Sequence, residues 1–183
     1  MKASDIPNII TVFRFLLVPP VVLLLLDGRF GLALLMFGVA GFSDGLDGYL
    51  AKRFSWSSRL GALMDPLADK LLLVSSFITL GWLNQIPLWL VSVVILRDLV
   101  IVSGALVYHF RIERLEAEPS MLSKSNTVAQ ILLVLAVMFS AAVQALPYLW
   151  MDVLLYSVLV TTLWSGIDYV WRWSRRAWQK GAH

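Results

Sequence analysis

The chain is ordered as six apolar runs, each close to the length of one membrane-spanning helix, separated by short segments of Gly, Pro and charged residues. A helix needs about 20 consecutive apolar residues to cross the hydrocarbon core of a bilayer. The six runs cover residues 9–26, 30–50, 60–83, 88–110, 121–146 and 148–173. This pattern predicts an all-α polytopic membrane protein with six transmembrane helices, built as a single domain over residues 1–183.

The first run carries polar and proline residues that distinguish it from the others. Arg14 lies within it, and Pro19 and Pro20 interrupt it, which argues against a cleavable signal peptide. We expect residues 6–16 to form an N-terminal interfacial helix that leads into the first span. Because this segment lacks the Arg-rich and Ser-rich pattern of an organellar transit peptide, we expect a location in a bacterial inner membrane.

The distribution of basic residues predicts the orientation of the spans. Six spans place both termini on the same side of the membrane, and the opposite side receives Arg29. The side with the termini receives Lys2, Arg14, Lys52, Arg53, Arg59, Arg111, Arg114, Lys124, Arg172, Arg175, Arg176 and Lys180. Since Lys and Arg are enriched in cytoplasmic loops, we expect both termini to be cytoplasmic.

Composition narrows the class of protein. The chain is 59% hydrophobic and 15% charged, whereas a soluble domain has about 45–50% apolar and about 25% charged residues. A globule of 183 residues could not bury this excess, which argues against a soluble enzyme, a nucleic-acid-binding protein and a disordered chain. We attribute the sequence pI of about 9.4 to basic loops that face anionic lipid.

Four of the twelve acidic residues lie within two consecutive predicted spans. Asp44 and Asp47 are three residues apart, and Asp65 and Asp69 are four apart, so each pair shares one face of a helix. The short loop between the spans makes them antiparallel neighbours, so all four side chains can converge. Carboxylates inside a membrane are costly and usually mark a functional site.

Four converging carboxylates resist ionisation together unless a cation neutralises them. Oxygen ligands select hard divalent ions, and two such ions suit a phosphoryl-type displacement. The spacing therefore predicts a site for two divalent cations, Mg²⁺ or Mn²⁺. Two alternatives stay open: the acids are helix caps or loop ion pairs, or the protein is a small cation transporter.

The same residues carry a resemblance to a known family. The stretch 44–69 resembles the CDP-alcohol phosphotransferase motif, D-x2-D-G-x2-A-R-x8-G-x3-D-x3-D. Every fixed position is matched except one, where Lys52 replaces Arg and is followed by Arg53. Arg and Lys differ in their binding of phosphate, so this chain departs from the family at a nucleotide contact.

The resemblance implies an integral membrane enzyme that transfers a phosphatidyl group from CDP-diacylglycerol to an alcohol and releases CMP. It also implies a homodimer, and it assigns Asp69 as the general base on the acceptor hydroxyl. The residues that it assigns to the two metal ions are Asp44, Asp47, Asp65 and Asp69. The residues that it assigns to the CDP part are Asp47, Gly48, Ala51, Lys52 and Gly61.

Two further stretches narrow the resemblance. Residues 6–14 resemble the opening of phosphatidylglycerophosphate synthases and of CMP-forming cardiolipin synthases, and residues 123–130 resemble the cardiolipin synthases. Glycerophosphate-using enzymes tend to have Lys where this chain has Asn126, and an amide binds hydroxyls without requiring an anion. We therefore expect phosphatidylglycerol as the acceptor, with glycerol 3-phosphate as the alternative.

The candidates for binding the acceptor or phosphate are Asn8, Thr11, Arg14, Arg53, Arg59, Arg97, Ser123, Lys124 and Asn126. Each group of candidates has an alternative explanation. The N-terminal candidates fit a helix cap with a snorkelling Arg, and Lys124 fits a positive-inside anchor. Arg97 and Asp98 fit a pair that neutralises itself within the helix bundle.

Overall fold

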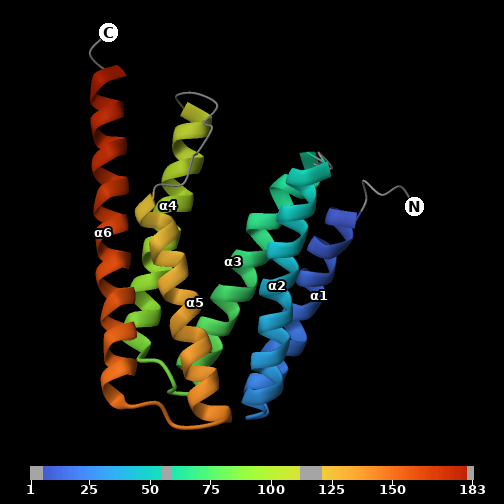
Figure 1. Cartoon of the computed structure of the whole chain (residues 1–183). Helices are drawn as coiled ribbons and strands as arrows, with labels where there is room; N and C mark the ends of the chain where they lie inside the picture. Colours follow the sequence, from blue (N-terminus) through green and yellow to red (C-terminus); the bar gives the residue numbers. More distant parts are fainter. Residues whose placement is uncertain (1–5, 55–58, 112–120, 181–183) are drawn as a thin grey trace. The chain divides into compact units, whose positions relative to one another are not determined.

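The computed structural model is all-helical over the residues that it describes (Figure 1). Its six helices are α1 (Ile6–Leu26), α2 (Phe30–Phe54), α3 (Arg59–Trp82), α4 (Leu88–Arg111), α5 (Met121–Ala142) and α6 (Tyr148–Lys180). The structure describes residues 6–54, 59–111 and 121–180, without the side chains of residues 6–9, 46–54, 59–63, 65–66, 105–111 and 172–180. The predicted all-α class, with one helix for each apolar run, is confirmed.

Two helical stretches in the described part of the chain have the length and apolar composition to cross a bilayer, Met121–Ala142 and Tyr148–Trp171. The stretches Ile10–Leu26 and Phe30–Gly45 are apolar but shorter. Large apolar side chains are exposed on all six helices, as expected of a surface that faces lipid. These features are those of a membrane protein, while the six-span topology and the cytoplasmic termini stay predictions.

The N-terminal helix differs from the sequence-based expectation. Instead of a short helix over residues 6–16 followed by a break, α1 continues through Pro19 and Pro20. Each proline removes one intrahelical hydrogen bond. Helix α1 nevertheless buries Val21 and Leu25 completely, and we attribute its continuity to this packing against neighbouring helices.

Helices α1 and α3 both end in a left-handed turn. Gly28 has a φ of 71° and Asn84 a φ of 57°, a conformation that Gly adopts freely and Asn tolerates. After α1, the N–H of Arg29 donates to the carbonyl of Leu24 at 2.8 Å, which is the six-residue bond of a Schellman motif. The segments that end the first and third apolar runs in the sequence therefore act as helix C-caps.

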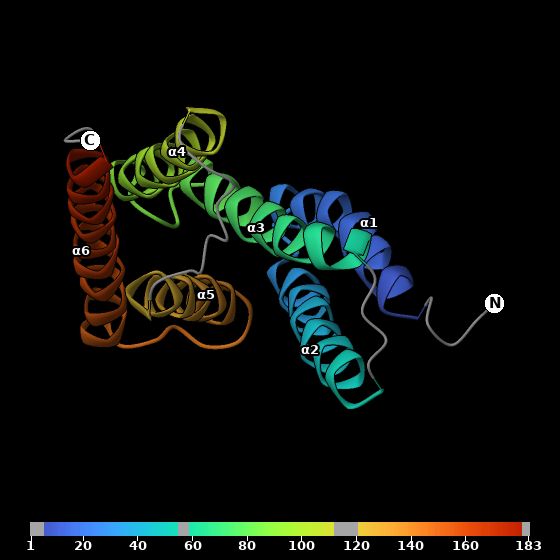
Figure 2. The same cartoon turned by 90° about the horizontal axis from the view of Figure 1, so that it is seen from above.

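The chain divides into two compact units. The first consists of Met1–Ile86 with Val134–Leu146, and the second of Pro87–Leu133 with Pro147–His183. In the first unit α1 packs against both α2 and α3 (Figures 1 and 2). In the second unit α4 packs against α6, and hydrogen bonds join both helices to the N-terminal half of α5.

Candidate functional sites in the two units

Arg14 is a fully buried charged residue on an apolar helix of the first unit. It precedes Val18, Val21 and Leu25 by four, seven and eleven residues, so it shares their buried face of α1. Because that face packs against α2 and α3, the fold directs the guanidinium toward these two helices.

Two carboxylates from different helices meet this guanidinium. Nη1 of Arg14 lies 2.9 Å from Oδ1 of Asp44 on α2. The same Nη1 donates to Oδ1 of Asp69 on α3 and forms an ion pair with it. We name Arg14, Asp44 and Asp69 the acidic cluster. It joins two aspartates of the sequence motif through one atom.

The acidic cluster has the chemistry of a cation site. The side chains of Asp44 and Asp69 remain 42% and 45% exposed, and the three named side chains carry two negative charges and one positive charge. Accessible carboxylate oxygens therefore converge from two helices. Hard divalent ions prefer such oxygens, so the described donors fit Mg²⁺ or Mn²⁺.

The other two aspartates of the predicted metal site lie outside the described side chains. Asp47 is on α2 and Asp65 is on α3, so the convergence of four carboxylates stays a prediction. Within the described part of the chain, no group of three acidic or histidine side chains forms a metal site.

Of the remaining candidates near the motif, one has a described side chain and the others do not. Thr11 is buried one turn before Arg14, on the same side of α1. The side chains of the other N-terminal and motif candidates lie outside the description, namely Asn8, Gly48, Ala51, Lys52, Arg53, Arg59 and Gly61.

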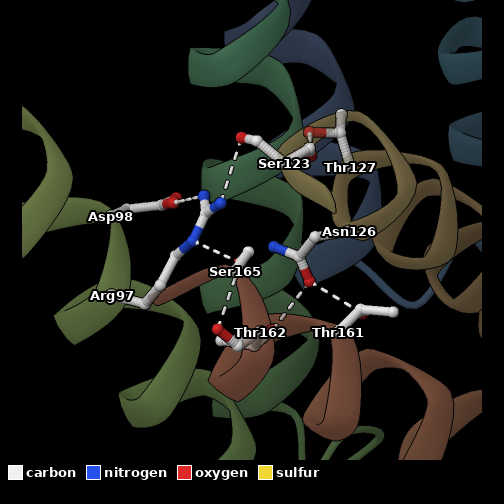
Figure 3. Close-up of polar contacts among 8 residues, drawn as sticks. All are labelled: Arg97, Asp98, Ser123, Asn126, Thr127, Thr161, Thr162 and Ser165. Carbon is white, nitrogen blue, oxygen red and sulfur yellow. Dashed lines mark hydrogen bonds and ion pairs between the residues drawn. The ribbon is translucent and has the colours of Figure 1, made fainter. Parts of the chain in front are cut away.

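A second arginine lies at the centre of a polar cluster in the second unit, where α4, α5 and α6 contribute side chains (Figure 3). Arg97 of α4 is 7% exposed. Its Nη1 lies 3.0 Å from Oδ1 of Asp98, its Nη2 donates to Ser123 of α5, and its Nε donates to Ser165 of α6, the last two also at 3.0 Å. The contact between Arg97 and Asp98, which the sequence left open as an alternative to acceptor binding, is present, and the guanidinium also contacts α5 and α6.

An amide from α5 completes this group. Oδ1 of Asn126 accepts hydrogen bonds from Thr161 at 3.0 Å and from Thr162 at 2.8 Å. Figure 3 shows the amide nitrogen directed away from both threonines. That nitrogen is buried and has no hydrogen-bond partner among the described residues. We name the whole group the amide cluster: Arg97, Asp98, Ser123, Asn126, Thr161, Thr162 and Ser165.

The amide cluster borders an apolar groove of about 1000 Å³ between α4 and α6. Arg97 and Thr162 line the groove together with apolar side chains such as Leu96 and Ile167. The groove thus joins an apolar surface to a buried guanidinium, as a site for an amphipathic molecule would.

Three of the predicted acceptor candidates, Arg97, Ser123 and Asn126, belong to the amide cluster, whereas Lys124 is exposed. Their role in binding the acceptor stays a prediction. The prediction missed Thr161, Thr162 and Ser165 of α6. Their signal was present in the sequence, because hydroxyl residues three and four positions apart share one face of an otherwise apolar helix.

Comparison with known proteins gives one family match. The family model described as CDP-alcohol phosphatidyltransferase matches residues 4–164. Among curated proteins, the chain is 30% identical over 180 residues to a cardiolipin synthase (CMP-forming) of Rattus norvegicus, covering 90% of this chain and 60% of the relative. It is 40% identical over 116 residues to one of Streptomyces coelicolor, covering 59% of this chain and 54% of the relative.

A relative with a different name matches over nearly its whole length. The CDP-diacylglycerol--glycerol-3-phosphate 3-phosphatidyltransferase of Blochmanniella floridana is 29% identical over 179 residues, covering 91% of this chain and 90% of the relative. By contrast, the chain spans less than two thirds of the length of the cardiolipin synthases named above.

Proposed function

The chain belongs to the CDP-alcohol phosphatidyltransferase family, and we propose that it transfers a phosphatidyl group from CDP-diacylglycerol to an alcohol with release of CMP. The observation that carries this proposal is the acidic cluster, in which Asp44 and Asp69 of the motif meet at Arg14. A network of intramembrane carboxylates serves such chemistry better than it serves a structural role.

The metal site follows from the same cluster. Family members generally depend on divalent metal ions. In our proposal Asp44, Asp47, Asp65 and Asp69 hold two divalent cations, Mg²⁺ or Mn²⁺. When bound, these ions would neutralise the diphosphate and stabilise the departing CMP.

Asp69 is the general base in this proposal. The acceptor hydroxyl gives its proton to the Asp69 carboxylate while its oxygen attacks the phosphorus that carries the diacylglycerol. The bond from that phosphorus to the bridging oxygen breaks, and CMP leaves with that oxygen. Arg14 holds the carboxylate by an ion pair, which fixes its orientation. The CDP part binds Asp47, Gly48, Ala51, Lys52 and Gly61.

The amide cluster is our candidate for the acceptor site. Arg97 offers a guanidinium to a phosphate, and the nitrogen of Asn126, which has no partner among the described residues, offers a donor to a neutral oxygen. The adjoining apolar groove suits a lipid acceptor. We therefore propose phosphatidylglycerol as the acceptor, which makes cardiolipin. The name of the Blochmanniella floridana relative supports glycerol 3-phosphate as the alternative.

The proposed setting is a bacterial inner membrane. We propose a single domain with six transmembrane helices, an N-terminal segment near the interface and both termini in the cytoplasm, with the active site on the cytoplasmic side. The active protein is a homodimer in this proposal, by family resemblance. Accessibility of the termini to a membrane-impermeant reagent tests the orientation.

Acceptor-dependent CMP release tests the function. Purified protein is incubated with CDP-diacylglycerol, Mg²⁺ or Mn²⁺, and either phosphatidylglycerol or glycerol 3-phosphate. We expect CMP with phosphatidylglycerol and none after chelation of the metal. Release only with glycerol 3-phosphate overturns the choice of acceptor. Absence of release with either acceptor contradicts the enzyme class and favours the transporter alternative.

A charge substitution tests how the acceptor is selected. We expect Asn126→Lys to increase the use of glycerol 3-phosphate relative to phosphatidylglycerol, because an ammonium binds a free phosphate. Ser125→Lys adds the same charge at the adjacent exposed position and is expected to leave the ratio unchanged. An unchanged ratio in Asn126→Lys would mean that position 126 does not recognise the phosphate.

A further inference from the structure

Helix α5 carries two buried primary amides that lie one turn apart. Asn126 is 1% exposed and Gln130 is 3% exposed. Within the described part of the chain, neither amide nitrogen has a hydrogen-bond partner. Four residues separate them, so both side chains leave the same face of the helix, about 6 Å apart along its axis.

Buried amide donors without partners are unfavourable, and native proteins seldom keep them without a reason. The nitrogen of Asn126 could find partners if its amide turned, because the hydroxyls of Thr161 and Thr162 can accept as well as donate. An apolar residue at position 130 would not bury an amide without a partner. It would pack as Leu133 and Val134 do, which lie buried on the next turn. Gln130 is therefore the buried donor for which the described residues supply no partner.

We propose that Gln130 is a second hydrogen-bond donor of the acceptor site and binds a neutral oxygen of a glycerophospholipid. This inference rests on the proposed function and extends it to Gln130, the last residue of the stretch 123–130. Its amide nitrogen would donate to a hydroxyl or ester oxygen, neither of which requires a charged partner.

The depth of Gln130 favours a lipid over a water-soluble acceptor. Gln130 is the tenth residue of α5, more than two turns beyond Met121. Arg97 contacts Ser123 within the first turn of α5, so a phosphate at Arg97 lies nearer the helix start. Glycerol 3-phosphate is small enough to make its contacts close to Arg97. The glycerol ester region of a lipid extends further along the helix, to Gln130.

Gln130→Met tests the assignment, because Met has a similar length and no amide. CMP release is measured at varied phosphatidylglycerol and, separately, at varied CDP-diacylglycerol. We expect the KM for phosphatidylglycerol to rise about tenfold, consistent with the loss of one hydrogen bond, and the KM for CDP-diacylglycerol to stay unchanged. The Tm without substrate is expected to stay equal or rise, because an unpartnered buried amide is removed.

Matched variants decide between the possible outcomes. Gln85→Met makes the same change at an exposed position between α3 and α4 and is expected to alter neither KM. Gln130→Asn keeps the amide but shortens the side chain by one methylene. If Gln130→Met does not fold, the KM of Gln130→Asn for phosphatidylglycerol is measured instead. An unchanged KM for phosphatidylglycerol in a folded variant overturns the assignment.

The failure of this inference is distinct from the failure of the proposed function. A wild-type protein that releases no CMP with any acceptor removes the proposed function and this inference together. An active wild type that accepts glycerol 3-phosphate alone overturns only the lipid assignment. An active wild type whose KM for phosphatidylglycerol does not respond to Gln130→Met overturns only the role of Gln130.

Discussion

Each of the two units contains a buried arginine, and the partners of these arginines differ. Arg14 meets the carboxylates of Asp44 and Asp69, two half-exposed groups from different helices. Arg97 meets one carboxylate, that of Asp98, and two serine hydroxyls. Counted over the named side chains, the acidic cluster has two carboxylates for one guanidinium, whereas the amide cluster has one carboxylate for one guanidinium.

Because of this difference, the two clusters are suited to bind different kinds of ligand. A surplus of carboxylate oxygens attracts cations and accepts protons. A balanced cluster with spare N–H donors binds oxygens of a neutral or weakly anionic molecule. We therefore expect substitutions in the acidic cluster to lower kcat, and substitutions in the amide cluster to raise the KM for the acceptor.

The largest expected effect is that of Asp69→Asn. An amide cannot take the proton of the acceptor hydroxyl, so we expect kcat to fall about 10³-fold. CMP release at saturating substrate measures it. The matched control is Asp152→Asn, at an exposed position of α6, which is expected to keep full activity. Retention of a tenth of the wild-type kcat in Asp69→Asn would contradict the assignment of the base.

Arg14→Leu is expected to have the next largest effect. Loss of the guanidinium frees Asp69 from its ion pair, and removal of a group that orients a site residue typically costs about 10–100-fold in activity. The expected loss is in kcat, with the acceptor KM unchanged. Arg14→Lys retains the charge and is expected to recover part of the activity. A variant that alters only the acceptor KM would place Arg14 in the acceptor site instead.

Arg97→Gln tests the second arginine in the same way. A hydrogen bond to a charged group is worth about 1.5–3 kcal/mol, so we expect the acceptor KM to rise about 10–100-fold while the KM for CDP-diacylglycerol stays unchanged. The double variant Arg97→Gln with Asp98→Asn separates two roles. If Arg97 only neutralises Asp98, the double variant recovers the wild-type KM.

The smallest expected effect is that of Thr162→Val. This substitution removes one of the two hydroxyls that hold Oδ1 of Asn126, which permits the amide to turn. The loss of about 1 kcal/mol of hydrogen bonding corresponds to a rise of about fivefold in the acceptor KM. Thr162→Ser restores the hydroxyl and is expected to restore the KM. Thr127→Val, on an exposed hydroxyl bonded within its own helix, serves as the control.

The helices were predictable because their boundaries depend on local sequence. Gly28 and Asn84 adopt the left-handed turns that end α1 and α3, and Pro87 and Pro147 immediately precede α4 and α6. The continuity of α1 through Pro19 and Pro20 was not predictable, since it depends on packing with other helices. Local propensity favours a break there, and tertiary contacts override it.

The candidate sites were predictable to different extents. The spacing of Asp44 and Asp69 in the motif indicated their shared role, but the pairing of both with Arg14 needed the fold, since the three residues come from three helices. Likewise, the sequence pointed to Asn126 but not to the two threonines that orient it. Those contacts depend on the rotational positions of α5 and α6, which the apolar pattern leaves open.

Asp44 and Asp69 are bound by one and the same nitrogen of Arg14, which makes the guanidinium a resident competitor for their oxygens. Any second cation that uses these oxygens lowers the apparent affinity of Arg14 for them, and Arg14 lowers the apparent affinity of that cation by the same factor. The competitor is tethered to the chain and cannot be diluted. Because the guanidinium is part of the fold, its effect on cation binding at these two carboxylates is the same at every concentration of the protein.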